Sequence, residues 1–558
     1  MFGLAAFSET KTAVEAEGIY IGGWSIRRAL WPKTVDGKHD SSQDRVEHVA
    51  AVQDWDAAEE AALVRKLDCR VLLPCCIIYF LAYLDRANMG FVNIMHSGTK
   101  DSFEESLHLK GTDFNWSVSI TYFMVTVLLM PSNLVMKRFG AKKYFPVIMV
   151  LFGTIVMTIA AVKNVQGLLT ARFFLGIPEA GVVPTSIMYF SFWYKPTERA
   201  LRIGIFHAAN SLASGVGGFL AVAIDKLDGR AGLESWRWLF IIEGLLPIVM
   251  ALPVHFLLLT FPETSPALTD RERHIAINRF GRGSTRSTDV TWEWRTFFAV
   301  MKRPSTYVFF VSYICLLIVA VALGTFLPTI LKVFAKFSST KANEYSSAVY
   351  FAAIVVYAFW SWHSDWTRDR IWHYIIPAFF AIPCFAVWTY VGVHQSFSGI
   401  KPISLYGLAF LGNLVSIAQP AALSYRSTTL YGASEQAVGG AIAVSSLSIA
   451  SIIGPQIFPS EDAPWYVPGF AAASSTIAFA IVSFASLPVW LLLEARARKK
   501  KTGHAMPLRA MEDSEHAMVS AAALERLHEQ NMMENKIDVE TPRHVEEIPM
   551  ETPSKHLE

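Results

Sequence analysis

The chain has 558 residues, of which 53% are hydrophobic and only 17% are charged, and its mean hydropathy is positive at +0.34. A soluble protein of this length needs far more charge to cover its surface, so the composition excludes an ordinary soluble fold. The formal net charge of +2 does not indicate a nucleic-acid partner. The five cysteines have no metal-ligand spacing, and we interpret them as small apolar side chains.

Twelve apolar runs are long enough to cross a bilayer, which requires ~20 apolar residues per helix. They predict an all-α membrane protein with twelve transmembrane helices. Residues 1–65 form a polar N-terminal tail without the apolar core of a signal peptide, so we expect the first helix to serve as the insertion signal. The runs lie at 70–93, 114–136, 144–162, 167–191, 203–225, 238–260, 305–331, 345–363, 374–394, 403–424, 438–458 and 469–493.

Basic residues gather in the loops on one side of the predicted bundle. They occur after the second run at 137–143, throughout the long loop at 262–304, and after the last run at 496–501. The loop at 94–113, on the other side, has two lysines against four acidic residues. Because loops rich in lysine and arginine stay in the cytoplasm, we expect both termini to be cytoplasmic.

The long loop divides the runs into six and six. This division predicts an N-terminal half at 66–261, a cytoplasmic linker at 262–304 and a C-terminal half at 305–493. Within the linker, Thr269-Asp-Arg-Glu272 is typical of a capping box that begins a short helix. We expect the charged tail at 494–558 to be cytoplasmic and disordered. The layout resembles that of a major facilitator transporter, whose binding site lies near the midplane between the halves.

Five charged residues interrupt the apolar runs of the first half: Asp85, Arg86, Arg172, Glu179 and Glu243. Each costs at least ~2.5–3.5 kcal/mol at bilayer depth, so such residues usually have a role. Arg172 and Glu179 are seven residues apart and therefore share a helix face, about 10 Å apart along the axis. Asp85 and Arg86 are adjacent and diverge by about 100°, so we expect one to face the fourth span and the other to face a cavity.

Two interpretations of these charges stay open. They form either a static ion-pair cluster that holds the first and fourth spans together, or the machinery of a proton-coupled carrier. In a carrier, a carboxylate takes up a proton and a guanidinium binds a carboxylate substrate by a bidentate contact. The second half has no matching set of acids and bases, so we expect coupling to be located in the first half.

Further polar residues of the runs are weaker candidates for substrate contacts. Asn88 shares a helix face with Asp85, and Tyr83 lies where a cavity wall is expected. His207 and Asn210 follow on the fifth span, although an isolated histidine in a helix more often satisfies a neighbouring group. Gln419 on the tenth span is a candidate contribution from the second half.

Several motifs resemble those of a known family. Tyr83-Leu-Asp-Arg-Ala-Asn-Met-Gly90 and Arg172-Phe-Phe-Leu-Gly-Ile-Pro-Glu-Ala-Gly181 are similar to the first-span and fourth-span signatures of the anion:cation symporter family, within the major facilitator superfamily. Ser191–Arg199, Gly232–Gly244 and Ile453–Phe458 resemble its fungal allantoate permease branch. The resemblance covers about residues 66–500.

This resemblance implies a role for each charged residue. Proton-coupled uptake of a small organic anion is expected, such as a carboxylate vitamin or a nitrogen-source nutrient. Arg86 would bind the anionic group, and Asp85 and Glu179 would be protonated. Arg172 would pair with one of these carboxylates and release it during transport.

The resemblance also marks a cytoplasmic gate and a departure. The loop after the eighth span keeps Asp365, Arg368 and Arg370, which are expected to act as a gate rather than as substrate ligands. The sequence of residues 414–425 on the tenth span differs from the one expected in that branch, so the identity of the anion stays open.

Other functions are less compatible with the sequence. An exporter of a fungal secondary metabolite or drug by proton antiport is the alternative, but Ser211–Gly218 lacks the Gly-Pro motif of many antiporters. A sensor is disfavoured by the short tail, and an enzyme by the lack of a nucleophile–base pair, a phosphate loop or a metal cluster. We expect no cofactor and no metal. The expected partners are the substrate, protons and the lipid bilayer but no nucleic acid, for a monomer in the plasma membrane.

Overall fold

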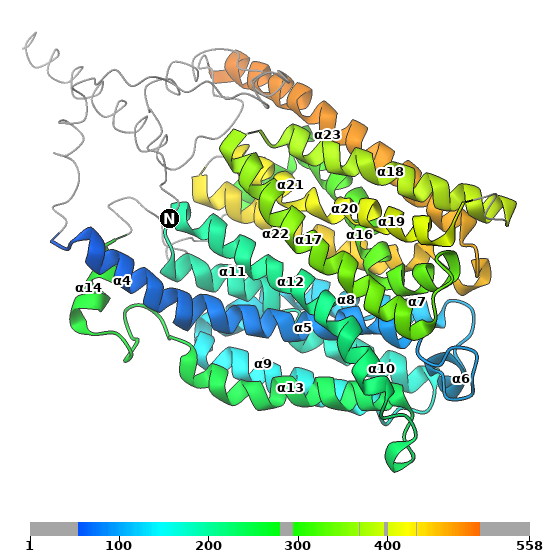
Figure 1. Ribbon diagram of the computed structural model, residues 1–558. Coiled ribbons are helices and arrows are strands. Elements are labelled where there is room, and N and C mark those ends of the chain that lie inside the picture. Colours follow the sequence, from blue (N-terminus) through cyan, green and yellow to red (C-terminus); the bar gives the residue numbers. More distant parts are fainter. Residues whose placement is uncertain (1–53, 280–293, 368, 396–399, 431, 503–558) are drawn as a thin grey trace, which may run out of the picture. The chain divides into compact units, whose positions relative to one another are not determined.

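The computed structural model describes residues 54–279, 294–367, 369–395, 400–430 and 432–502, and these form helices without a β-strand. Figure 1 shows the helices in chain order. The tail expected to be disordered from residue 494 instead continues the last helix to Thr502, because no helix-breaking residue interrupts it there, and its remainder lies outside the described residues. The elements are α4 (Ala57–Leu67), η1 (Asp68–Leu72), α5 (Leu73–Val92), α6 (Phe103–Leu107), α7 (Asp113–Ser119), α8 (Thr121–Phe139), α9 (Ala141–Ile159), α10 (Val165–Glu179), α11 (Val182–Trp193), α12 (Pro196–Asp225), η2 (Arg230–Gly232), α13 (Ser235–Leu257), α14 (Asp270–Asn278), α15 (Trp294–Met301), α16 (Pro304–Phe334), α17 (Ser339–Thr367), α18 (Ile371–His394), α19 (Pro402–Gly412), α20 (Leu414–Ile417), α21 (Gln419–Thr428), α22 (Gly432–Ile453), η3 (Gly454–Ile457), η4 (Ser460–Asp462) and α23 (Val467–Thr502).

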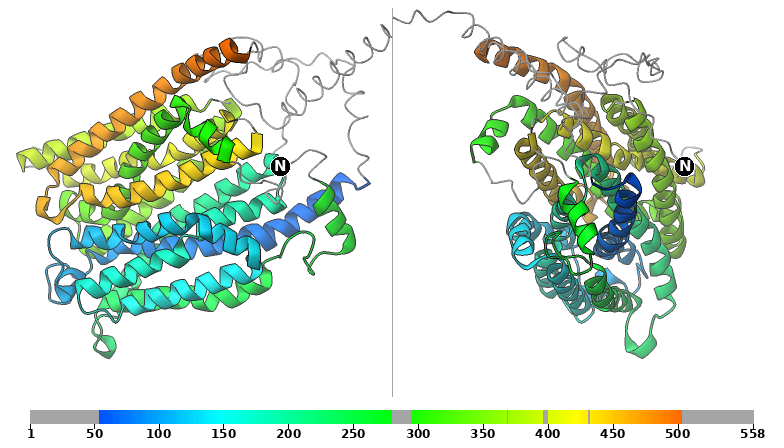
Figure 2. Two further views of the ribbon diagram at one scale, coloured as in Figure 1. Left: turned by 180° about the vertical axis from the view of Figure 1, so that it is seen from behind. Right: turned by 90° about the vertical axis from the view of Figure 1, so that its left-hand side faces the viewer.

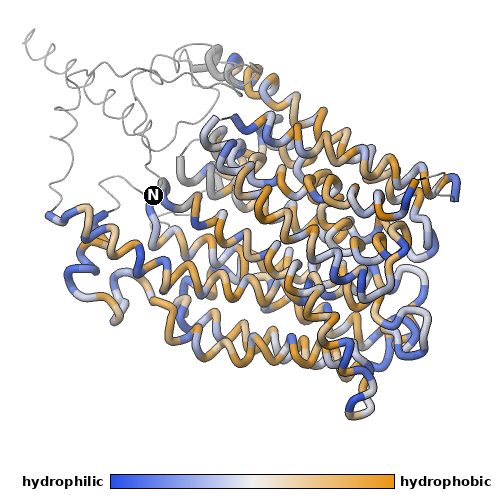
Figure 3. Tube along the Cα trace, viewed as in Figure 1, coloured by the Kyte–Doolittle hydropathy of each residue, from blue (hydrophilic) through white to orange (hydrophobic). Residues whose placement is uncertain are grey.

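The described residues contain eleven helices long and apolar enough to cross a membrane, and a twelfth span if Asp113–Leu129 and Pro131–Phe139, which are bent by 58° relative to each other, are counted as one helix. This confirms the predicted all-α membrane fold. Hydrophobic residues cover the middle of the helices in Figure 3, and hydrophilic residues gather at their ends. The first helix begins at Ala57, well before the predicted residue 70, because Asp56 and Glu59 form a capping box there.

Besides the bent second span, two of the predicted spans are broken helices. The fourth span divides into α10 and α11 at Ala180 and Gly181, where a Cβ on Gly181 would collide with the hydroxyl groups of Tyr144 and Ser132. The tenth span divides into α19, α20 and α21 at Asn413 and Ala418. The first break agrees with the prolines near Glu179, and the second was not predicted.

Helices pack within each half and between the halves. In the first half, α5 packs against α12, and α9 packs against α13 where Gly153 and Gly244 allow close backbone approach. In the second half, α23 packs against α16 and α18. Between the halves, α12 lies along α17, and α5 contacts α16. Figure 2 shows these layers from behind and from the side.

The linker contains the predicted capped helix, α14. The Thr269 hydroxyl accepts a hydrogen bond from the Glu272 backbone N–H at 3.2 Å, and the Glu272 carboxylate accepts one from the Thr269 N–H at 2.8 Å. Lys66 on α4 donates to Glu272 at 2.7 Å, so α14 is held against the first half. The end of the bundle that carries α14 is called the linker end below, and the end that carries α6 is called the opposite end (Figure 1).

Candidate functional site

A cavity of about 160 Å³ lies between the two halves. Its wall comes from α5, α7, α8, α10 and α12 of the first half and from α16, α17, α20, α21 and α22 of the second. Of the residues predicted from the sequence, Tyr83, Asp85, Arg86, Arg172, Glu179, His207, Asn210 and Gln419 all line it. The structure therefore brings together side chains from spans that are far apart in the sequence.

One buried ion pair joins α5 to α10. Arg172 Nη1 donates to Asp85 Oδ2 at 2.7 Å, and the two residues are 3% and 2% exposed. Arg172 Nε also donates to the Ser117 carbonyl at 3.2 Å, and the Thr121 hydroxyl donates to the Arg172 carbonyl at 2.9 Å. Asp85 Oδ1 has no hydrogen-bond partner among the described residues. The pair is thus held in place from α7 and α8, while one carboxylate oxygen stays unused.

A second ion pair joins the same two helices. The Arg86 guanidinium pairs with the Glu179 carboxylate. It also lies over the rings of Tyr83 and Tyr122, with its central carbon 5.4 and 5.2 Å from the ring centroids. Arg86 is therefore surrounded by one carboxylate and two aromatic faces.

The expectation that only one of Asp85 and Arg86 faces the fourth span was wrong. Both pair with residues of α10, and both also line the cavity. Their partners Arg172 and Glu179 are two turns apart on α10, so two adjacent side chains that diverge on α5 each reach a different one.

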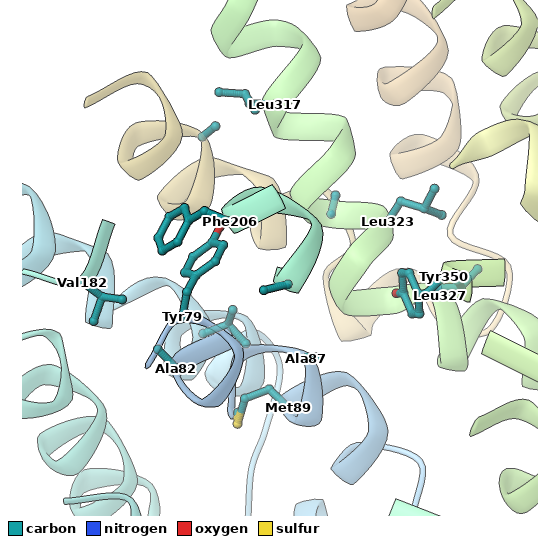
Figure 4. Close-up of a cluster of buried hydrophobic side chains, with 14 of the residues drawn as sticks. Tyr79, Ala82, Ala87, Met89, Val182, Phe206, Leu317, Leu323, Leu327 and Tyr350 are labelled. Atoms are coloured by element: carbon teal, nitrogen blue, oxygen red, sulfur yellow. The ribbon is translucent and has the colours of Figure 1, made fainter. Parts of the chain in front are cut away.

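His207 and Asn210 lie on α12 at the cavity wall. The ring of His207 packs edge-on against Tyr79 and Phe206, with centroids 5.9 and 5.6 Å away. Tyr79 in turn stacks on Phe206 at 4.4 Å, as Figure 4 shows. The His207 ring is therefore held at the cavity wall by packed aromatic rings.

Asn88 lies outside the cavity lining. It is fully buried, and neither amide atom has a hydrogen-bond partner among the described residues. Its Oδ1 approaches Gly217 on α12, so the side chain faces the α5–α12 interface. Although Asn88 and Asp85 lie on the same face of α5, only Asp85 lines the cavity.

Several aromatic residues of the cavity wall were not predicted from the sequence. Besides Tyr79 and Tyr83, the wall contains Tyr122, Tyr313, Tyr350 and Tyr357. Tyrosine is common in apolar helices, and no charge marked these positions. Helical spacing offered one signal, because Tyr350 and Tyr357 are seven residues apart and therefore share a face of α17.

The proposed gate residues are only partly described. Arg368 lies outside the described residues, and of Asp365 only the backbone is described. Arg370 Nη1 donates to the Ser364 hydroxyl at 2.8 Å. Asp369, which was not predicted, accepts from the backbone N–H groups of Ile371 and Trp372 and so caps α18.

Hydrogen bonds join the two halves toward the opposite end. Asn115 Nδ2 on α7 donates to the carbonyls of Pro455 and Phe458 at 2.5 and 2.9 Å. The Ser119 hydroxyl donates to the Ile452 carbonyl at 2.8 Å. Nearby, Phe114 packs edge-on against Phe326, with ring centroids 5.9 Å apart.

Known proteins share this fold and sequence pattern. Residues 75–455 match the model of the Major Facilitator Superfamily. The MFS transporter prlL of a fungal species (strain NRRL 50135) is 30% identical over 352 residues, which cover 60% of this chain and 71% of that protein. A putative tartrate transporter of Agrobacterium vitis is 28% identical over 321 residues, which cover 57% of this chain and 68% of that protein.

A solved structure has the same fold. The crystal structure of a bacterial homolog of the human lysosomal transporter Spinster, in an inward-facing and unoccupied conformation, aligns with a TM-score of 0.59 and 15% identity. The alignment covers 75% of this chain and 96% of that chain. The chain therefore belongs to the Major Facilitator Superfamily, and it is a multi-pass membrane transporter rather than an enzyme.

Proposed function

We propose that this transporter takes up a small organic anion together with protons. The observation that carries the proposal is the pairing of two carboxylates with two guanidinium groups in the wall of one cavity between the halves. Such charges are expensive inside a membrane, and a cavity is where they can meet a charged solute. A purely structural pair does not need to face a cavity.

In the proposed mechanism, Glu179 controls whether Arg86 is available to a substrate. While Glu179 is ionised, Arg86 is occupied by it. A proton on Glu179 cancels that attraction and leaves an unpaired guanidinium, a situation that costs ~3–5 kcal/mol in a buried site. A carboxylate substrate relieves this cost by binding Arg86 in a bidentate manner. Proton and anion therefore favour each other's binding.

The neighbouring side chains suit such a substrate. Tyr83 and Tyr122 flank Arg86, and Asn210 and His207 lie on the facing helix α12. Gln419, at the start of α21 beside a helix break, offers an amide from the second half. We propose these residues as substrate contacts, with Asp85 and Glu179 as the protonated groups.

The finer assignment rests on the sequence motifs and on one relative. We propose membership of the anion:cation symporter family and a place near its allantoate permease branch. A relative named as a putative tartrate transporter supports a carboxylate as the class of substrate. We also propose cytoplasmic termini, a plasma-membrane location, a monomer, and a gating role for Asp365, Arg368 and Arg370.

Uptake measurements test the proposal. Cells that express the chain are given radiolabelled tartrate and a panel of small monocarboxylates, at an acidic and at a neutral external pH. At least one carboxylate should accumulate faster at acidic pH. Arg86→Ala should abolish this uptake, whereas Glu179→Gln should remove its pH dependence and retain counterflow exchange.

The same panel separates the competing functions. Full, acid-stimulated uptake by both variants would refute the roles of Arg86 and Glu179. Uptake without pH dependence in the unmodified chain would indicate facilitated diffusion. Faster efflux from preloaded cells, with no uptake, would indicate an exporter.

A further inference from the structure

One buried acid takes no part in the two ion pairs. Glu243 lies on α13 and is only 4% exposed. Both of its carboxylate oxygens lack a hydrogen-bond partner among the described residues, and it does not line the cavity. A buried carboxylate without a hydrogen-bond partner from the protein is far less stable than the neutral acid. The neutral acid is therefore the form that this burial favours.

Glu243 lies at the depth of the Asp85–Arg172 pair. Asp85 is seven residues before the end of α5 at Val92, Arg172 is seven residues after the start of α10 at Val165, and Glu243 is eight residues after the start of α13 at Ser235. At 1.5 Å per residue, each lies roughly 10–12 Å from the opposite end. Because α13 packs against α5, Glu243 and Asp85 lie on neighbouring helices at this depth.

Among the described residues, the other helices packed against α13 bring no further charge to this position. On α9, the residues that meet α13 here are Gly153 and Met157, and the lysines of α9 lie at its linker end. On α12, Asp225 lies at the terminus, where His96 contacts it at 3.0 Å. The charged groups that face Glu243 are thus Asp85 and Arg172.

We propose that Glu243 is the alternate carboxylate partner of Arg172 during transport. The inference rests on the proposed proton coupling and adds a third acid to it. In this conformation Asp85 holds Arg172, while Glu243 carries a proton. When Asp85 takes up a proton at its unpartnered Oδ1, Arg172 is released and pairs with Glu243. Glu243 then gives up its own proton, so one proton is gained on Asp85 and one is lost from Glu243.

This exchange keeps the buried guanidinium neutralised throughout the cycle. Arg172 is 3% exposed, so it needs a carboxylate whichever way Asp85 is protonated. The movement also shifts Arg172 from a partner in the cavity wall to one behind it. A proton on Asp85 is thereby converted into a displacement of α10 relative to α13.

Infrared spectroscopy on the purified full-length protein in lipid nanodiscs tests the exchange without any substrate. At neutral pH, the spectrum of the unmodified protein minus that of Glu243→Gln should show one protonated-carboxyl band. In Asp85→Asn, Arg172 has lost its partner, so Glu243 should ionise and the band should disappear. In the double variant Asp85→Asn/Arg172→Gln the cation is gone as well, and the band should return.

Matched variants guard against trivial effects. Glu234 lies just before the same helix and pairs with Arg237. Its substitution Glu234→Gln should leave the protonated-carboxyl band unchanged. Asp85→Ser removes the carboxylate in a second way if Asp85→Asn does not fold. Labelling by dicyclohexylcarbodiimide, which reacts with buried protonated carboxyls, should modify Glu243 in the unmodified protein and not in either Asp85 variant.

Two results would overturn the inference. One is the absence of the band from the unmodified protein. The other is its persistence in both Asp85 variants, which would mean that Arg172 does not turn to Glu243. A negative uptake panel would remove the proposed function instead and would leave these bands as they are.

Discussion

Asn115 offers a direct way to alter the balance between conformations. Its side-chain amide donates two hydrogen bonds across the halves, to the carbonyls of Pro455 and Phe458. In Asn115→Ala both carbonyls lose their partner while they stay buried. When the halves separate at this end, water reaches the same carbonyls, so the loss applies only to the closed conformation.

The size of the effect follows from the two hydrogen bonds. Each contributes about 0.5–1.5 kcal/mol, so the closed conformation should lose about 1–3 kcal/mol relative to the open one. Since 1.4 kcal/mol is a factor of ten, the ratio of open to closed protein should rise about 5- to 150-fold.

Distances between spin labels at the opposite end measure this ratio. Lys163 and Lys401 are exposed there, one in each half, and can be changed to cysteine after the exposed Cys69 is replaced by serine. Asn115→Ala should move a large part of the distance distribution to longer values. Purified protein in nanodiscs without substrate suffices for the measurement.

Asn164→Ala is the matched control. The Asn164 side chain accepts from the Gly167 backbone N–H at 2.8 Å and caps α10 within one half. Its loss costs ~1 kcal/mol in either conformation and should leave the distances unchanged. An unchanged distance distribution in Asn115→Ala, or an equal shift in Asn164→Ala, would refute the idea that the Asn115 hydrogen bonds stabilise the closed conformation.

Two further predictions concern stability and the linker. Gly153→Ala should destabilise the fold by about 1–3 kcal/mol, because the new Cβ meets the Gly244 carbonyl, whereas Gly204→Ala, with open space around it, should not; thermal unfolding in detergent compares them. Partial burial opposes the charge of Glu272, but hydrogen bonds from Lys66 and from the Thr269 backbone outweigh it and lower the pKa of Glu272. The stabilisation is therefore full above the unfolded pKa of ~4.3 and is lost as the pH falls through the lower folded pKa. In Glu272→Gln the loss of ~0.2–1 kcal/mol of stabilisation should speed amide hydrogen exchange of α14 up to about 5-fold at neutral pH. Equal exchange rates in the variant and the unmodified protein would contradict this.

The transmembrane helices were predictable because lipid imposes one rule on each. A spanning segment must be long, apolar and helical, so composition over ~20 residues suffices to find it. Helix ends were less predictable, since they depend on single capping groups such as Asp56, which extends the first helix far beyond the apolar run. The break at Asn413 and Ala418 in the tenth span was missed because no proline or glycine marks those two positions themselves.

The site was predictable to the extent that charge marks it. Asp85, Arg86, Arg172 and Glu179 stood out because each is expensive in a membrane, and the structure places all four at one cavity. Which acid pairs with which base depends on helix rotation and side-chain reach, which spacing alone does not specify. The tyrosines of the second half carry no charge, so no comparable energetic cost marked Tyr313 or Tyr357.

The charges of the cavity constrain the order of events in the proposed mechanism. Two carboxylates and two guanidinium groups sum to zero, so the empty cavity offers an anion no net attraction. Protonation of one carboxylate gives the cavity a net charge of one positive unit, which an anion then neutralises. Because linkage is reciprocal, an anion that binds more tightly to the protonated cavity must raise the affinity for the proton by the same factor. A monoanion with one proton then crosses without net charge, and the membrane potential, worth ~2.3 kcal/mol per charge at 100 mV, neither helps nor opposes it. A dianion with one proton would carry that cost, so the proposed site favours substrates whose charge matches the protons taken up.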